Sequence, residues 1–178
     1  MINRLIVAAL AALLLLGYVG FAIASSDRPE TAVATAATAS FHKLTAAQDA
    51  GWSVHVADLS GKTCIDEPGM GAMGDHFANG SLLFDGVIDP ATPEALVYEQ
   101  RNDGSFKLVA LEYLVLKADW EAAGHTSPPE LFGHTFNFTP AGNRFGLPPY
   151  YSLHAWIWKP NPAGMFEMWN PNVSCPDL

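Results

Sequence analysis

The segment that decides the fold is residues 94–117, with the sequence EALVYEQ-RNDGS-FKLVALEYLVLK. Two runs rich in Leu, Val and Tyr flank Arg101–Ser105, where Asp-Gly tolerates the positive φ that hairpin turns need. The pattern predicts a β-hairpin with strands over 94–100 and 106–117. Both strands are apolar on both faces, which is typical of a sheet that lies between two layers or curls into a barrel.

The segments around this hairpin extend the same fold. Residues 44–50 contain good helix formers and end at Gly51, so we expect a short helix there. Residues 150–159 predict a third strong strand. Residues 66–80 and 118–149 are rich in Gly and Pro and are expected to be loops, with one helical turn at 119–123. The predicted fold class is α+β and mainly antiparallel β, a barrel-like or strongly curved sheet with a short N-terminal helix and long loops.

The first residues are typical of a targeting segment. Arg4 is followed by an uncharged apolar run from Leu5 to Ala24, which ends in the small-x-small pattern Ala-Ile-Ala. Residues 1–24 are therefore predicted to be either a cleaved signal peptide or an uncleaved N-terminal membrane anchor. Residues 25–40 lack large apolar side chains and are predicted to be a flexible linker. Residues 41–178 would then form a single globular domain, exported to the periplasm or secreted.

Composition and charge restrict the partners. The chain has 178 residues, of which 49% are hydrophobic and 15% charged, so it is not a disordered chain. It carries 9 Lys and Arg against 18 Asp and Glu, and the basic residues are scattered singly. No basic stripe is available to neutralise phosphates, which excludes nucleic acid as a partner. We expect a small molecule or a metal ion, and contact with a membrane only through the N-terminal segment.

The cysteines predict a disulfide. Cys64 and Cys175 are the two cysteines of the chain, and an even pair in an exported protein favours a structural bridge. Closing a loop of more than 100 residues contributes on the order of 4–5 kcal/mol in the chain-entropy treatment.

Glu112 is the most informative charged residue. On an alternating strand it shares a face with the apolar residues Phe106, Leu108, Ala110, Leu114 and Leu116. A carboxylate that points inward needs a cation, a hydrogen-bond donor or a proton, because unpaired burial costs several kcal/mol. The alternative is that this face is partly exposed.

Glu99 is the second candidate carboxylate. If Asp103-Gly104 is the centre of the turn, Glu99 faces Leu108, and Glu112 lies on the same face, about 13 Å further along the strand. The carboxylate pairs of glycosidases lie about 5–9.5 Å apart. The spacing therefore disfavours a hydrolase that uses both groups.

The third strand combines a histidine with two tryptophans. His154, Trp156 and Trp158 are two residues apart and share one face of an ideal strand. This face either lines a cavity with an aromatic wall or forms a packed core in which the histidine is hydrogen-bonded. The candidate ligand-binding residues are Trp156, Trp158 and Tyr113.

A metal site can be assembled from the isolated histidines and these carboxylates. His76, Glu99, Glu112 and His154 are the candidate ligands, and two imidazoles with a carboxylate suit Zn, Fe or Mn with open coordination positions. The spacing signal is weak, because no His-x-His pair occurs. The sequence also has no Gly-x-Ser-x-Gly, His-Glu-x-x-His or Cys-x-x-Cys motif.

Four segments together carry a resemblance. GAMGDHFAN, PEALVYE, LVALEY and LHAWIWKPNPAGMF occur in this order. They resemble a family of exported bacterial proteins of unknown function, and the likeness covers roughly residues 45–176. It implies one exported domain with this order of segments, and it implies no substrate, cofactor or catalytic residue.

Three functional hypotheses follow. The leading one is an exported small-ligand or divalent-metal binding domain with a His/Glu/Trp-lined cavity. The second is a metal-assisted or general acid–base enzyme that uses the same residues. The third is an envelope interaction module with no catalytic site. The first two require that Glu112 points inward and lies next to imidazole.

Overall fold

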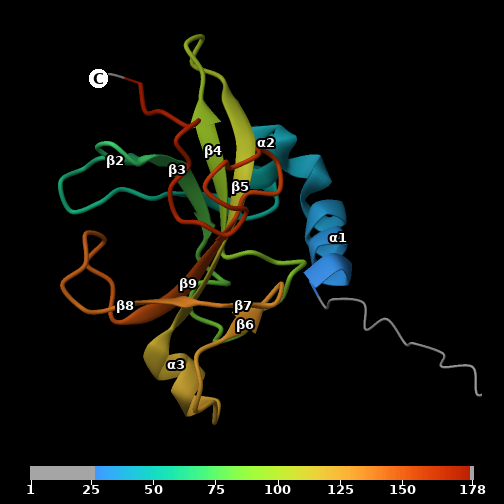
Figure 1. The fold of residues 1–178 in the computed structure, drawn as a ribbon, viewed down its shortest axis with the longest axis vertical. Helices are drawn as coiled ribbons and strands as arrows, with labels where there is room; N and C mark the ends of the chain where they lie inside the picture. Colours follow the sequence, from blue (N-terminus) through green and yellow to red (C-terminus); the bar gives the residue numbers. More distant parts are fainter. Residues whose placement is uncertain (1–26, 177–178) are drawn as a thin grey trace, which may run out of the picture.

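The structure is a computed structural model that describes residues 27–176, and it is an α+β fold dominated by antiparallel strands, as predicted (Figure 1). The predicted signal peptide or anchor over residues 1–24 lies outside the described residues. Within residues 27–176, no helix has the length and apolar character needed to cross a bilayer.

The main sheet has the strand order β1-β3-β4-β5-β9-β8, with β2 also paired to β3. Its strands are β1 Trp52–His55, β2 Cys64–Glu67, β3 Gly71–Asn79, β4 Ala95–Gln100, β5 Phe106–Leu116, β8 Asn137–Thr139 and β9 Tyr150–Ala155. A separate ribbon joins β6 Glu130–Leu131 to β7 His134–Thr135. Among the described strands, none pairs β8 with β1 or β2, so the sheet is open, and of the two expected forms, barrel-like or strongly curved, a closed barrel is not found. β8 is only 3 residues long and pairs with β9 alone, which ends the sheet there.

Helices cover one face of this sheet. They are α1 Asp27–Thr38, the 3-10 turn Ala39–His42 and α2 Leu44–Asp49, and α3 Lys117–Ala122 follows β5 directly. Figure 1 shows α1 and α2 together on one side of the strands. The helix expected over 44–50 is confirmed, and it ends just before Gly51.

Helix α1 lies where the sequence predicted a flexible linker over residues 25–40. Four alanines favour the helix, and their small side chains allow close packing. Ala34 and Thr38 are fully buried, and Glu30 Oε2 accepts the Phe132 N–H at 2.6 Å. From Asp27 onward, this segment is helical and packed against the rest of the chain.

The helix-covered face holds the larger core. Leu96 on β4 and Leu111 on β5 are direct partners there, and Leu153 on β9 belongs to the same buried cluster. Burying each such side chain contributes about 1.5–3 kcal/mol. The opposite face carries Ala95, Ala110 and Glu112 and is therefore partly polar.

The β4–β5 hairpin is confirmed, but its register contains a bulge. Tyr98 pairs with Leu108 and Val97 pairs with Ala110, so Val109 is an extra residue on β5. Near the turn Glu99 therefore faces Lys107 and not Leu108 as expected. The bulge also divides the predicted apolar stripe, because Phe106 and Leu108 pack in the helix-covered core while the Glu112 side of β5 faces the other way.

Strand β3 corrects the expectation of a loop over residues 66–80. A Cβ on Gly71 would lie 2.2 Å from the Asn170 carbonyl oxygen, and a Cβ on Gly74 would lie 2.5 Å from the Tyr98 oxygen. Gly74 also has a φ of +104°, a conformation that favours glycine. The glycines of this segment permit close approach of neighbouring backbone segments. Their number therefore does not indicate a loop here.

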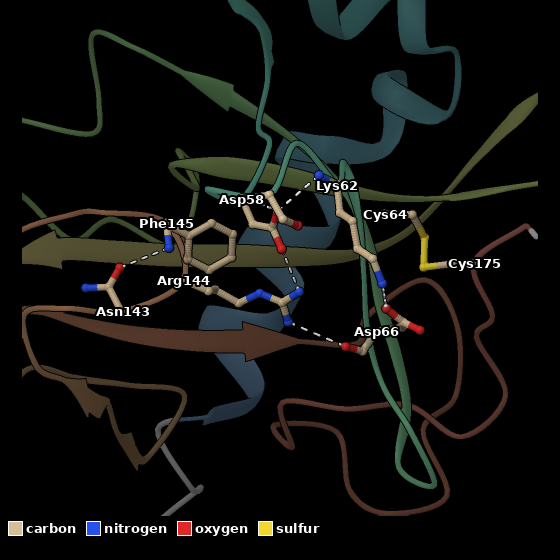
Figure 2. A network of polar contacts seen from close by, with 9 residues as sticks. Asp58, Lys62, Cys64, Asp66, Asn143, Arg144, Phe145 and Cys175 are labelled. Atoms are coloured by element: carbon tan, nitrogen blue, oxygen red, sulfur yellow. Dashed lines mark hydrogen bonds and ion pairs between the residues drawn. A yellow bond between two sulfur atoms is a disulfide. The ribbon is translucent and has the colours of Figure 1, made fainter. Parts of the chain in front are cut away.

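The predicted disulfide between Cys64 and Cys175 is present, with a Cα–Cα distance of 5.6 Å. It fastens the C-terminal tail to β2 (Figure 2). The tail is also held by the reciprocal backbone hydrogen bonds of Ala72 and Asn170, at 3.2 and 3.1 Å. The tail is thereby fixed beside β3.

Candidate metal centre

Three strands supply the polar groups of one buried cluster. His76 comes from β3, Glu112 from β5 and His154 from β9. Glu112 and His154 are direct partners across the β5–β9 ladder, whereas β4 lies between β3 and β5. On β4, Glu112 faces Ala95, and this small side chain leaves room for the carboxylate to turn toward β3.

The polar atoms of the cluster converge on one point. His76 Nε2 lies 3.3 Å from His154 Nε2 and 3.8 Å from Glu112 Oε2, and His154 Nδ1 is in contact with Glu112 Oε2. One ligand atom from each residue lies within 4.8 Å of the other two. Ligand atoms about 2.0–2.2 Å from a metal lie roughly 3.0–3.6 Å from each other, so the separations approach those of a coordination shell.

The ring contacts indicate how the imidazoles are used. His154 Nδ1 contacts Glu112, so a neutral ring that carries its proton on Nδ1 would turn the lone pair of Nε2 toward His76. A carboxylate that holds one imidazole nitrogen while the other binds a metal is a common arrangement in metal sites. Trp156 stacks on the His154 ring at 5.8 Å between centroids and helps to fix its plane.

Hydrogen bonds do not satisfy every atom of the cluster. Glu112 Oε2 and His76 Nδ1 are buried, and neither has a hydrogen-bond partner of acceptable geometry. Buried polar atoms of this kind are rare and call for a water, an ion or a ligand. The cluster therefore leaves two buried polar atoms available to a further group.

The charge of Glu112 is set by two opposing effects. Burial raises the pKa of its carboxyl, but the neighbouring imidazoles of His154 and His76 outweigh burial and lower the pKa to about 2. Glu112 is thus ionised at neutral pH, as a metal-ligating carboxylate must be.

The cluster lies in the wall of a cavity of about 380 Å³. This size falls within the range of about 300–1,000 Å³ that is typical of small-molecule sites. The wall is largely apolar, with contributions from β3, β4, β5 and β9 and from loops. Its apolar residues include Val56, Met73, Leu83, Phe145, Leu147, Met168 and Trp169.

Glu94 is a cavity residue that the sequence reasoning missed. It is 1% exposed, and its Oε2 accepts the Leu114 N–H at 2.9 Å. Burial raises the pKa of its carboxyl to about 8, against the lowering effect of the backbone hydrogen bonds. Its burial is hard to predict from the sequence, because a glutamate at the first position of a predicted strand is ordinarily solvated. The only hint was its place directly after Pro93, where β4 begins.

A charged network joins two loops at the rim of the cavity (Figure 2). Arg144 donates to Asp58 Oδ2 at 2.9 Å, and the Leu59 N–H donates to the Arg144 carbonyl oxygen at 2.8 Å. The Ser60 hydroxyl and the Arg144 guanidinium hold the pKa of Asp58 well below its usual range. Residues 56–62 are thereby fastened to residues 143–147.

The other predicted site residues lie elsewhere. Glu99 is paired with Lys159 Nζ at 2.6 Å and is not part of the cluster. Trp156, Trp158 and Tyr113 do not line the cavity. Each donates a hydrogen bond to a different group: Trp156 to the Glu167 carbonyl, Trp158 to the Thr38 hydroxyl and Tyr113 to the Pro90 carbonyl. The expected His-Trp-Trp face is interrupted because β9 ends at Ala155.

The arrangement can do two things chemically. It can bind a divalent cation with open positions toward the cavity, or it can pass a proton along Glu112, His154 and His76.

No family model, curated protein or solved structure matches this chain.

Proposed function

We propose that this chain is an exported domain that binds a divalent metal ion, and with it a small ligand, through His76, Glu112 and His154. The observation that carries the proposal is the convergence of three buried ligand atoms within 4.8 Å of one another in a cavity wall. Two imidazoles and a carboxylate suit Zn, Fe or Mn. Three protein ligands leave coordination positions open toward the cavity.

The energetics of burial support this proposal. Glu112 is 8%, His76 7% and His154 4% exposed, so all three groups have lost nearly all contact with water. Burying a carboxylate is costly unless a cation or several donors face it. Glu112 Oε2 contacts His154 but makes no hydrogen bond of acceptable geometry within residues 27–176, and a bound cation would give this oxygen a fully charged partner.

The test is metal uptake by the full chain without a histidine tag. The protein is stripped with a chelator, dialysed and titrated with Zn²⁺, Mn²⁺ and, without oxygen, Fe²⁺, and bound metal is counted by mass spectrometry. We expect one ion per chain for the preferred metal. We also expect loss of uptake in His76→Ala and normal uptake in His125→Ala, whose exposed ring only stacks on Trp120. Absence of stoichiometric uptake, or equal uptake by both variants, would overturn the proposal.

A second candidate function is general acid–base catalysis without a metal. It is favoured by the contact chain from Glu112 through His154 to His76, in which a carboxylate orients an imidazole. It requires that the ¹⁵N resonances of both imidazoles stay unchanged during metal titration. Large shifts of both resonances on addition of one equivalent of metal would exclude it.

A further inference from the structure

Glu94 is the second carboxyl group in the cavity wall, and its surroundings differ from those of Glu112. Glu112 lies between two imidazoles, whereas Glu94 forms no ion pair within the described part of the chain. Its Oε2 accepts the Leu114 N–H, two residues beyond Glu112 on β5. This contact holds the carboxyl at the end of the β4–β5 ladder, facing the cavity.

We propose that the cavity accepts an uncharged, mainly apolar small molecule with one carbonyl-type oxygen, and that Glu94 recognises this oxygen as a hydrogen-bond donor. The inference rests on the proposed function, because it places this ligand beside the metal. It goes further by assigning a specificity-determining residue and a ligand class.

The shape and lining of the cavity favour an apolar ligand. About 380 Å³ is enough for a compact organic molecule, and Val56, Leu83, Leu147 and Trp169 supply aliphatic and aromatic contacts. Transferring such a molecule from water into this space is favourable in proportion to its apolar area. A charged group on the ligand would lose its hydration in this space and would gain no partner there.

The charges around the cavity argue against an organic anion. Arg144 is the one Lys or Arg among the described lining residues, and its guanidinium already binds Asp58 at 2.9 Å. The acidic lining residues are Glu94 and Glu112. The acidic residues would therefore repel an anionic ligand, and Arg144 is already paired, so only the metal would attract the anion.

The state of Glu94 argues against an organic cation. A carboxyl that is 1% exposed and faces no cation is stable only in its neutral form. Burial, together with the negative charges of Asp85 and Glu112, raises its pKa to about 8. At neutral pH the group therefore offers an O–H donor while its other oxygen accepts the Leu114 N–H.

The first experiment compares three probes of similar shape and different charge. The metal-loaded full chain, labelled with ¹⁵N, is titrated with acetophenone, with benzoate and with the ammonium form of α-methylbenzylamine at neutral pH. The Leu114 amide is the reporter, because its N–H contacts Glu94 directly. We expect acetophenone to shift this resonance and to bind about tenfold tighter than either charged probe, the order of one neutral hydrogen bond. Preference for the ammonium or for benzoate, or no shift with any probe at millimolar concentration, overturns the inference.

The second experiment uses matched variants of Glu94. Glu94→Gln keeps an acceptor for Leu114 and a donor for the ligand, so we expect it to retain acetophenone binding. Glu94→Leu keeps a similar volume without the donor, so we expect a loss of about tenfold in affinity. Metal content is counted in every sample, so that failure of the metal site is seen separately from failure of ligand recognition. Equal affinity of the two variants, with metal bound, overturns the role of Glu94.

Discussion

His76 Nε2 lies 3.3 Å from His154 Nε2, although the two imidazoles are 78 residues apart in the chain. Their strands β3 and β9 are separated in the sheet by β4 and β5. Three strand spacings amount to about 14 Å on a flat sheet. The two side chains meet at the Glu112 carboxylate, which both imidazoles approach, and we infer that this face of the sheet is concave there.

Substitution of His154 tests the metal centre most directly. We expect His154→Ala to weaken metal affinity by about 100-fold or more, because it removes a ligand and also the group that orients Glu112. The measurement is competition with a chromophoric chelator. His125→Ala is the control, because its exposed ring lies on Trp120 away from the cluster. An affinity of His154→Ala within about twofold of the unaltered chain would remove His154 from the ligand set.

Glu94 predicts a pH dependence of stability. Its pKa rises from the ordinary value of 4.5 to about 8 on folding, so between these values the folded chain holds a proton that the unfolded chain has released. The free energy of unfolding therefore falls as the pH rises from about 4.5 to about 8, by up to a few kcal/mol. Glu94→Gln has no such proton and should remove this part of the decline.

The measurement is urea unfolding of the metal-free chain at pH 5 and pH 8. From pH 5 to pH 8, we expect the free energy of unfolding to fall less for Glu94→Gln than for the unaltered chain. Glu130→Gln serves as the control, because Glu130 is exposed. If both variants show the same pH dependence, the Glu94 carboxyl is ionised in the folded chain.

The disulfide predicts a large effect of reduction. Cys64 and Cys175 close a loop with a sequence separation of 111. Their bond restricts the unfolded chain and contributes on the order of 4–5 kcal/mol in the chain-entropy treatment. Reduction should lower the urea midpoint of the unaltered chain and leave that of the double variant Cys64→Ala, Cys175→Ala unchanged. Equal midpoints with and without reductant in the unaltered chain would mean that the bridge contributes little.

Much of the site could be predicted from single residues, because their chemistry conflicts with their neighbours. Glu112 interrupts an apolar strand, and this conflict correctly indicated a partner inside the fold. His76 and His154 could be named as partners because imidazole is a common metal ligand, although no His-x-His spacing marks them. Glu99 could not be excluded, since its pairing with Lys159 depends on a contact across 60 residues.

The remaining parts of the fold and the site depend on features that the alternation of apolar and polar residues along a strand does not encode. The bulge at Val109 moved Phe106 and Leu108 to the other face, and the end of β9 at Ala155 separated Trp156 from the strand. Gly71 and Gly74 are typical of a loop by composition, but here they allow close approach of other backbone segments within a strand. Glu94 was missed because only the folded cavity shows that its carboxyl is buried.

The contact between Arg144 and Asp58 at the rim of the cavity predicts how often the two rim loops separate. Arg144 links residues 143–147 to Asp58, and loss of its guanidinium should let the two loops separate more often. Arg144→Met keeps the aliphatic stem and the backbone carbonyl that accepts the Leu59 N–H, so the variant loses the guanidinium contacts with Asp58 and with the Asp66 carbonyl oxygen. We expect hydrogen exchange of the Leu59 amide to accelerate about tenfold. Lys62→Met is the matched control, because the Lys62 side chain contacts half-buried Asp66 at 3.5 Å and its loss leaves Asp58 paired with Arg144. An unchanged exchange rate at Leu59 in Arg144→Met would mean that the backbone hydrogen bond alone holds the rim.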